Sequence, residues 1–285
     1  MQWPISSARL APRRKPTEGG RESALSLARF FLSLAIIAWA FRSFIVQPFY
    51  IPSGSMLPTL YIGDYLTVAK WPYGYSRYSF PFGEPAFNGR ILGHLPQRGD
   101  VVVFRHPTEN SDLIKRVIGL PGDTIEVREG VVILNGRPLT RQPLSPYKLA
   151  ISANTPCRVV PPAIPAVVQS DGQAFCVFPA YRESLPGGPS YIVLDQGATA
   201  ADDFGPVKVP SNHVFLMGDN REDSLDSRYS AAEGGIAMVP TQDLIGRAAF
   251  TFWSTDGSAS WWKPWTWFTA LRGNRIGNGY TGDAK

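Results

Sequence analysis

The chain has 285 residues, 44% of them hydrophobic, which is enough for one sizeable domain together with a membrane anchor. Its formal net charge of +5 comes from basic residues that are scattered along the sequence. A nucleic-acid-binding protein needs a focused basic patch, so the composition argues against that class and favours a membrane as the partner.

The first 46 residues are predicted to anchor the chain in a membrane. Residues 1–23 carry mostly basic charges among Pro and Gly residues, and we interpret them as a disordered tail that stays cytoplasmic by the positive-inside rule. Residues 24–46 are apolar apart from Arg29 and Arg42, which lie near the two ends, where their side chains reach lipid headgroups. This predicts a transmembrane helix of about 20 residues. Because only residues 30–41 are free of charge, a signal-peptide core or a buried helix is the alternative.

Residues 51–60 place two serine hydroxyls, Ser53 and Ser55, in an irregular loop. Pro52 and Pro58 fix their own φ angles while Gly54 leaves one joint free, so the segment suits neither a helix nor a strand. Reactive groups are often held on such loops. An ordinary turn has the same composition, and the loop alone does not decide between the two.

A lysine with apolar neighbours lies in residues 112–123, which predict a strand closed by a Pro-Gly turn. Alternation sets Lys115 on the same face as Leu113 and Val117. Burial there would lower the pKa of the amine, and a shift of about two units costs the fold roughly 3 kcal/mol. A neutral amine can take a proton from a serine. The alternative is a lysine that extends its head to water.

Residues 63–70, 101–104, 124–127 and 131–134 have the alternation or β-branched composition of strands, and Asn135-Gly136 predicts a hairpin turn. From about 138 to 210 the composition shifts to Pro, Ser, Gly and Ala, which we interpret as an inserted subdomain. It holds both cysteines, Cys157 and Cys176, and outside the cytoplasm a disulfide between them would contribute about 3 kcal/mol. Two free thiols are the alternative. The cysteines and histidines show no paired ligand spacing, so no metal site is expected.

Residues 214–228 predict an apolar strand followed by a loop of alternating charges and hydroxyls. Ser224 could hydrogen-bond an amine, and the acids and arginines of the loop could pair and brace it. A solvated turn is the alternative.

Residues 253–285 follow the last predicted strand, 247–252, and are rich in tryptophan beside basic residues. Tryptophans with flanking cations are typical of the membrane–water boundary, so we predict a membrane-proximal tail. Packing against the domain is the alternative. The tryptophans are Trp253, Trp261, Trp262, Trp265 and Trp267.

Four motifs occur in the order found in bacterial type I signal peptidases, also called leader peptidases, and the chain resembles this family. They are residues 52–56 (PSGSM), 98–104 (RGDVVVF), 115–123 (KRVIGLPGD) and 218–228 (GDNREDSLDSR). The similarity extends from about residue 25 to 252, with a gap between about 140 and 210. The expected fold is mainly β, with an antiparallel β-sheet catalytic domain, one N-terminal transmembrane helix and a β-rich inserted subdomain.

The resemblance implies a serine/lysine dyad. Ser55 would be the nucleophile, Lys115 the general base, and Ser224 the residue that orients the lysine. Ser53 would lend its hydroxyl to the oxyanion hole, beside the backbone N–H of Ser55. Structural ion pairs would support the site and would involve Asp219, Asp226, Arg228 and Arg116. No metal or organic cofactor is called for.

The resemblance further implies a membrane-anchored serine endopeptidase that removes signal peptides from exported preproteins, cutting after small residues at −1 and −3. By position in the motifs, the pockets would be lined by Phe49, Ile51, Met56, Leu60, Leu66, Val103 and Ile114. The partners would be signal peptides of secreted preproteins and the lipid bilayer, with no nucleic acid, and the enzyme would be a monomer. Residues 47–285 would be the periplasmic domain of a single-pass protein of the bacterial inner (plasma) membrane.

Two departures from the family pattern are visible. Glu222 and Asp223 stand where Asp-Asn is usual, and Leu113 stands where tyrosine is common. An inward-facing Asp223 would favour the charged form of Lys115, so we predict that it points to solvent. Leu113 is expected to alter one wall of the substrate pocket.

Two other classes of function, and one other catalytic arrangement, remain as alternatives. The nearest is a dedicated pilin-type or conjugation-type processing peptidase of the same fold; the anchor argues against a self-cleaving repressor. A non-catalytic, membrane-tethered binding protein is more distant. A Ser/His/Asp triad stays open because triads are defined by geometry, and the chain's histidines are His94, His106 and His213.

Overall fold

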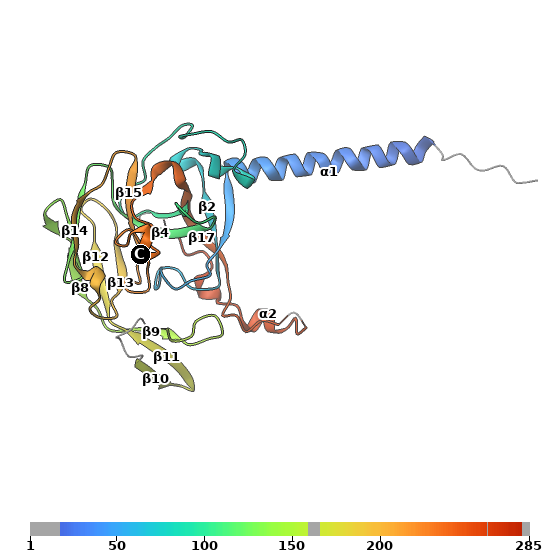
Figure 1. Ribbon diagram of the computed structural model, residues 1–285. Coiled ribbons are helices and arrows are strands. Elements are labelled where there is room, and N and C mark those ends of the chain that lie inside the picture. Colours follow the sequence, from blue (N-terminus) through green and yellow to red (C-terminus); the bar gives the residue numbers. More distant parts are fainter. Residues whose placement is uncertain (1–17, 159–165, 261, 281–285) are drawn as a thin grey trace, which may run out of the picture. The chain divides into compact units, whose positions relative to one another are not determined.

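The computed structural model describes residues 18–158, 166–260 and 262–280 (Figure 1). The chain divides into two compact units, residues 1–41 and 42–285. Residues 1–17 of the predicted basic tail, and Trp261 of the predicted tryptophan-rich tail, lie outside the described residues.

Helix α1 spans Glu18–Phe44, and its segment Ser23–Phe44 has a mean hydropathy of 1.9. With 22 residues, this segment is long and apolar enough to cross a membrane, and almost all of its side chains are exposed. The helix begins at Glu18 rather than at residue 24. It ends at Phe44 rather than at residue 46, because Pro48 cannot continue a helix and the chain enters strand β1 at Val46.

The second unit is built on one seven-stranded antiparallel sheet with the order β1-β2-β17-β3-β4-β15-β16 (Figure 1). Its strands are rich in apolar residues, many of them β-branched, and most of these residues are buried. Their bounds are β1 Val46–Tyr50, β2 Asp64–Ala69, β3 Val101–Arg105, β4 Asp112–Gly119, β15 His213–Met217, β16 Val239–Pro240 and β17 Leu244–Ser254.

Three smaller antiparallel sheets complete the unit, with the orders β14-β5-β6-β7, β13-β12-β8 and β10-β11-β9. The described part of the C-terminal segment contains the short helix α2, Thr266–Thr269. The strand bounds are β5 Thr124–Arg128, β6 Val131–Leu134, β7 Arg137–Pro138, β8 Thr140–Pro143, β9 Tyr147–Ala150, β10 Ala166–Ser170, β11 Gln173–Phe178, β12 Ala180–Ser184, β13 Ser190–Leu194 and β14 Phe204–Lys208.

The predicted mainly β fold is confirmed, and the strands expected from alternation are present. The Asn135-Gly136 turn joins β6 to β7, with φ angles of 53° and 76° that suit a hairpin turn. The segment predicted as an insert, residues 138–210, contains the strands from β8 to β14. The last of these, β14, pairs with β5. Cys157 and Cys176 are joined by a disulfide with a Cα–Cα distance of 5.2 Å.

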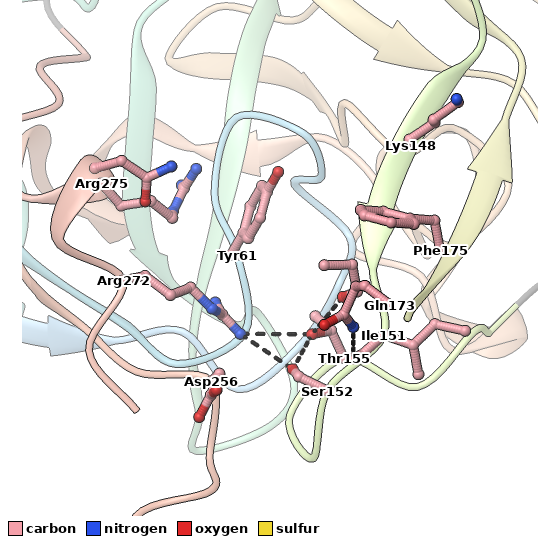
Figure 2. A pocket seen from close by; sticks show the side chains of 12 residues that line it. Tyr61, Lys148, Ile151, Ser152, Thr155, Gln173, Phe175, Asp256, Arg272 and Arg275 are labelled. Atoms are coloured by element: carbon pink, nitrogen blue, oxygen red, sulfur yellow. Dashed lines mark hydrogen bonds between the residues drawn. The ribbon is translucent and has the colours of Figure 1, made fainter. Parts of the chain in front are cut away.

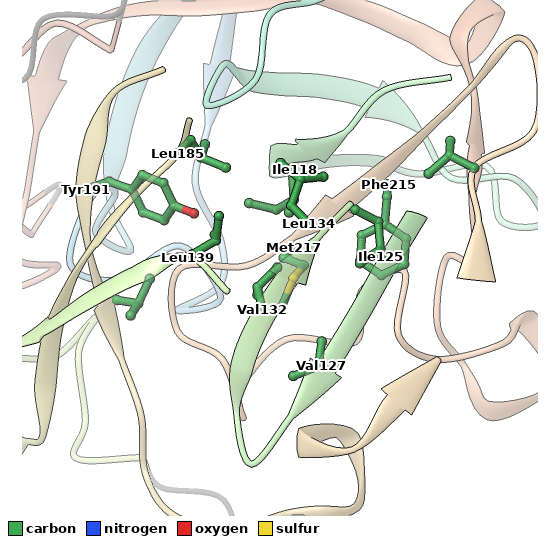
Figure 3. Packing of buried hydrophobic residues seen from close by; sticks show 12 residues of the cluster. Ile118, Ile125, Val127, Val132, Leu134, Leu139, Leu185, Tyr191, Phe215 and Met217 are labelled. Carbon is green, nitrogen blue, oxygen red and sulfur yellow. The ribbon is translucent and has the colours of Figure 1, made fainter. Parts of the chain in front are cut away.

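The apolar core lies on both faces of the large sheet and continues under the four-stranded sheet. Figure 3 shows one cluster, in which Ile118 of β4 and Phe215 and Met217 of β15 pack against Ile125 of β5 and Val132 of β6. Tight packing of this kind holds neighbouring strands in one register. The strands that flank the candidate site, β3, β4 and β15, are therefore rigid supports.

Candidate active site

The loop that carries Ser55 connects β1 to β2, and its two ends are tied together. Ile51 N–H donates to Asp64 O at 2.9 Å, and Gly63 N–H donates to Ile51 O at 3.0 Å. Between these ties the chain forms turns rather than helix or strand, as its prolines and glycine predict. The serine therefore sits on an irregular loop above a rigid pair of strands.

Asn220, in the loop after β15, holds the serine loop from another side. Its N–H donates to Ser55 O and its Nδ2 to Gly54 O, both at 3.1 Å. Gly218 lies against the same serine carbonyl: a Cβ there would come 2.6 Å from Ser55 O and 2.3 Å from Ser224 Oγ. Because a side chain cannot fit, glycine is needed for this close approach. These contacts fix the backbone on both sides of the serine hydroxyl.

Lys115 is the buried amine of the site. It lies on β4, only 4% exposed, and its Nζ donates to Ser55 Oγ at 2.8 Å and to Ile114 O at 3.2 Å. Burial lowers the pKa of Lys115 from 10.5 to about 8, although nearby carboxylates, led by Asp226, act in the opposite direction. The arrangement keeps an amine that can lose its proton next to the hydroxyl of Ser55, a residue that is itself only 6% exposed.

Two buried ion pairs brace the loop that follows β15. Arg116, the neighbour of Lys115, donates Nε and Nη2 to Asp219 at 2.7 and 2.6 Å. Arg228 donates Nε and Nη2 to Asp226 at 2.9 and 3.0 Å. Both pairs are bidentate, which fixes the geometry of the loop as well as its charge. The four residues expected to form structural ion pairs therefore occur as two pairs beside the lysine.

Among the residues that the structure describes, the two other serines of the predicted site, Ser224 and Ser53, do not hydrogen-bond to Lys115 as Ser55 does. Ser224 is 2% exposed, and in the described residues its Oγ has no hydrogen-bond partner. The expected hydrogen bond from Ser224 to Lys115 is therefore absent from the structure, although Ser224 packs against Gly218 near the serine carbonyl. Ser53 is exposed, two residues before Ser55. The structure thus brings Ser55 and Lys115 into contact, with Ser224 nearby and Ser53 at the surface.

The residues predicted to line the substrate pockets gather in one apolar cluster. Six of them are buried in it and Phe49 packs against it, together with residues of β17. The cluster includes Ile114, which precedes Lys115, and Met56, which follows Ser55. The six buried members are Ile51, Met56, Leu60, Leu66, Val103 and Ile114.

A cavity of about 350 Å³ lies elsewhere in the second unit, and neither Ser55 nor Lys115 lines it. Figure 2 shows Arg272 directed toward Ser152 and Thr155 in this cavity, with Tyr61 beside it. The cavity has a mixed polar and apolar lining, which comes from Tyr61, from β9 and the residues after it, from β11 and from the C-terminal segment. It is thus separate from the contact between the serine and the lysine.

The prediction that Asp223 points to solvent is wrong. Its side chain is only 10% exposed, and its Oδ1 lies 3.3 Å from Nη2 of Arg158. Because the partner comes from a distant part of the chain, the loop sequence alone gave no reason to expect an inward acid. Leu113 packs against the cluster that contains Tyr73 and Val102, and not against the predicted pocket residues.

Three residues of the site were missed at the level of sequence. Asn220 lies inside a motif that had been recognised, and its position next to Asp219 was the available signal. Glu183 accepts from Nη1 of Arg221 at 2.8 Å and also pairs with Nη2, and both side chains are buried. Glu183 and Arg158 lie in the Pro- and Ser-rich segment, where no motif marks them.

Within the described residues, the structure contains no group of three or more His, Cys, Asp or Glu side chains that could hold a metal ion. In the same part of the chain no histidine hydrogen-bonds to Ser55. His106 Nδ1 accepts from the N–H groups of Thr108 and Glu109, and His213 Nδ1 bonds to Ser211 O. The group in contact with the serine hydroxyl is therefore the lysine amine.

A mainly antiparallel β scaffold that holds a buried serine against a buried amine is the arrangement of a serine hydrolase. Comparison with known proteins gives the family. A model described as signal peptidase, peptidase S26, matches residues 24–253. The chain belongs to this peptidase S26 family of signal peptidases and is a serine endopeptidase.

Signal peptidases I from two Rickettsia species are among the relatives. The protein of Rickettsia canadensis (strain McKiel) is 32% identical over 269 residues, which cover 86% of this chain and 89% of that one. The protein of Rickettsia typhi (strain ATCC VR-144 / Wilmington) is 34% identical over 242 residues, covering 81% and 80%. A solved signal peptidase I from Enterococcus faecalis V583 is 23% identical and covers 54% of this chain and 97% of that one, with a TM-score of 0.28, which is too low to carry an argument.

Proposed function

We propose that the chain removes signal peptides from exported preproteins, with Ser55 as nucleophile and Lys115 as general base. The observation that carries the proposal is the 2.8 Å contact between Lys115 Nζ and Ser55 Oγ. With a pKa of about 8, half of the amine is neutral at pH 8. An exposed lysine would be neutral in only about one molecule in 300 at that pH. Burial thus makes Lys115 a general base at a pH where an exposed lysine would be almost fully protonated.

In acylation, Ser55 Oγ attacks the carbonyl carbon of the scissile peptide bond while Lys115 Nζ takes the hydroxyl proton. The C–N bond then breaks, and the proton passes from Nζ to the leaving amine, which is the new N-terminus of the mature protein. A water molecule that gives its proton to Nζ next attacks the ester carbonyl. This step releases the signal peptide as a carboxylate and restores Ser55.

The negative charge that develops on the carbonyl oxygen would be held by the N–H of Ser55 and the hydroxyl of Ser53. Within the described residues the N–H of Ser55 donates to no other group, which leaves it available for this role. The exposed hydroxyl of Ser53 is free to turn toward bound substrate. Loss of one such donor typically lowers turnover by about 10²–10³. Ser224, beside Gly218, would orient the lysine during the reaction.

Cleavage is proposed to follow small residues at −1 and −3, because the apolar cluster around Ile114 and Met56 lies next to both reactive residues. Small side chains would fit shallow depressions in this cluster, whereas large ones would clash with close-packed atoms. The seven predicted lining residues, from Phe49 to Ile114, support this assignment by gathering in one place.

The proposed enzyme is anchored by one transmembrane helix, formed by the segment Ser23–Phe44, with a cytoplasmic N-terminus and a periplasmic peptidase domain that follows it. The apolar exposed segment Ser23–Phe44 and the basic residues before it support this topology. The tail from residue 253 would lie at the membrane surface. Trp262 is 91% exposed, Phe268 79% and Trp265 66%, which suits contact with lipid.

Membership of a peptidase family argues against the non-catalytic binding protein. A dedicated processing peptidase for one substrate class remains the second candidate. A panel of unrelated preproteins separates the two, because a general signal peptidase cleaves most of them and a dedicated one cleaves a single type.

The test is cleavage of a preprotein with an Ala-X-Ala site by the purified full chain in detergent at pH 8. Ser55→Ala and Lys115→Met should each lower cleavage by at least about 10³. Lys70→Met is the matched control, because Lys70 is also a buried lysine whose pKa burial lowers to about 8, but its Nζ donates to the backbone of Ser79. Cleavage that survives Ser55→Ala or Lys115→Met, or that Lys70→Met abolishes equally, would contradict the proposed dyad.

A further inference from the structure

An ion pair between Arg158 and Asp223 lies beside the serine loop. Arg158 Nη2 is 3.3 Å from Asp223 Oδ1; the arginine side chain is 72% exposed and the aspartate side chain 10%. The other carboxylate oxygen, Oδ2, lies 3.2 Å from the position that a Cβ on Gly54 would occupy. The carboxylate is therefore packed against the residue that precedes Ser55.

The charge of this carboxylate matters to Lys115. A negative charge near an amine favours its protonated form, and a protonated Lys115 cannot accept the serine proton. Burial of the Asp223 carboxyl raises its own pKa, while Arg158 and Lys115 act to lower it. The carboxylates that act on Lys115 are Asp226, Asp223 and Asp219.

The three carboxylates differ in how their charges are balanced. Asp226 and Asp219 each face a buried arginine, Arg228 and Arg116, in a bidentate pair. In the described part of the chain, Asp223 has its ion pair with Arg158 alone. Its balance thus depends on a cation at the protein surface. The other buried acid of this region, Glu183, likewise has a buried arginine, Arg221, as its partner, and Arg141 lies 4.0 Å from it as well.

The segment that bears Arg158 is fastened at several points. The preceding residue, Cys157, is bridged to Cys176, which is fully buried in β11. Asn154 N–H donates to Asp256 O and its Nδ2 to Thr255 O, both at 3.0 Å. These ties hold the backbone that leads to Arg158, so only the arginine side chain has to be ordered when it meets the acid.

We propose that Arg158 is a positioning residue of the active site: it balances the charge of Asp223, so that this carboxylate does not hold the proton on Lys115. The inference rests on the proposed Ser55–Lys115 dyad. It explains how this chain tolerates an inward acid next to its base. The arginine comes from the segment between β9 and β10, which links that segment to the chemistry of the site.

The test is the pH profile of kcat/KM for preprotein cleavage by the full chain in detergent. Arg158→Ala should raise the apparent pKa by about half to one unit and leave the high-pH plateau unchanged, which lowers cleavage about 3–10-fold below the midpoint. Arg158→Lys keeps the charge and should restore most of the parent profile. Asp223→Asn should lower the apparent pKa of the kcat/KM profile. In the Asp223→Asn background, Arg158→Ala should change this pKa little.

Arg128→Ala is the matched control, because Arg128 is also an exposed arginine paired with an acid, Glu126, but on β5. It should leave the profile unchanged. The inference is overturned if Arg158→Ala keeps the parent midpoint, if its shift is as large in the Asp223→Asn background, or if it lowers the plateau alone, as a structural role would.

Failure of the inference is distinguishable from failure of the proposed dyad. If the parent is active and Ser55→Ala is not, the dyad stands. If the midpoint of the pH profile is then unchanged in Arg158→Ala, the role of Arg158 alone is overturned. An NMR titration of the Lys115 side chain without substrate gives a second readout. Arg158→Ala should raise that midpoint too, and an unchanged midpoint contradicts the inference whatever the activity.

Discussion

Replacing Asp226 by asparagine should destabilise the second unit strongly. Asp226 is fully buried and accepts two hydrogen bonds from the guanidinium of Arg228, at 2.9 and 3.0 Å. It also accepts one from the backbone N–H of Arg228 at 3.2 Å and one from Gly218 N–H at 3.1 Å. Asparagine keeps the shape but removes the charge, so the guanidinium of Arg228 stays buried without a counter-ion. Breaking a buried pair in this way typically costs about 3–5 kcal/mol. For a unit of this size that lowers Tm by roughly 10 °C.

Thermal unfolding of the full chain in detergent, followed by circular dichroism, measures this loss. Glu126→Gln is the matched control, because Glu126 pairs with the exposed Arg128, and it should change Tm by at most about 2 °C. The double variant Asp226→Asn with Arg228→Met removes the stranded charge and should recover much of the loss. A Tm for Asp226→Asn that matches Glu126→Gln would refute the reasoning.

The remaining predictions concern a titrating acid, a close backbone approach and the disulfide. Burial raises the pKa of Glu222 to about 7 from 4.5, so the folded state holds its proton over that range, and stability present below pH 4.5 is lost by pH 7. Between pH 5 and 8 the free energy of unfolding should fall by roughly 2–3 kcal/mol more in the parent than in Glu222→Gln, as measured by denaturant unfolding, and equal falls in the two would contradict the prediction. Gly218→Ala should displace the serine carbonyl and lower kcat about 100-fold at nearly constant KM; full activity would be inconsistent with the 2.6 Å approach. Thiol counting after denaturation should find no thiols until reductant is added, and two free thiols would exclude the Cys157–Cys176 bridge.

The large sheet could be predicted because its signals are local. Strand β4 holds two apolar pairs that include three β-branched residues, and Pro-Gly follows it, so neighbouring residues alone define the element. The segment from 138 to 210 gave weaker signals. Strand β10 is exposed along its whole length, and β14 pairs with β5 far away in the sequence, so neither has a pattern that a buried face would impose.

Part of the candidate site could be predicted from local motifs, and part of it could not. The serine loop and the lysine strand carry motifs, and the structure places Ser55 and Lys115 in contact. Asp223 was placed wrongly because the groups that it meets, Gly54 and Arg158, come from other parts of the chain. Long-range pairing of this kind leaves no trace in the local sequence, since each partner alone looks like a solvated charge.

The most direct test of the account is the titration of the Lys115 amine itself. With ¹³C-labelled lysine, the Cε resonance that disappears in Lys115→Met can be followed against pH in the full chain, with Lys70→Met used to exclude the other buried amine. The account predicts a midpoint near 8, because burial lowers the pKa of Lys115 to about that value. A midpoint near the ordinary 10.5 would mean that the amine stays charged at working pH and cannot serve as the base for Ser55.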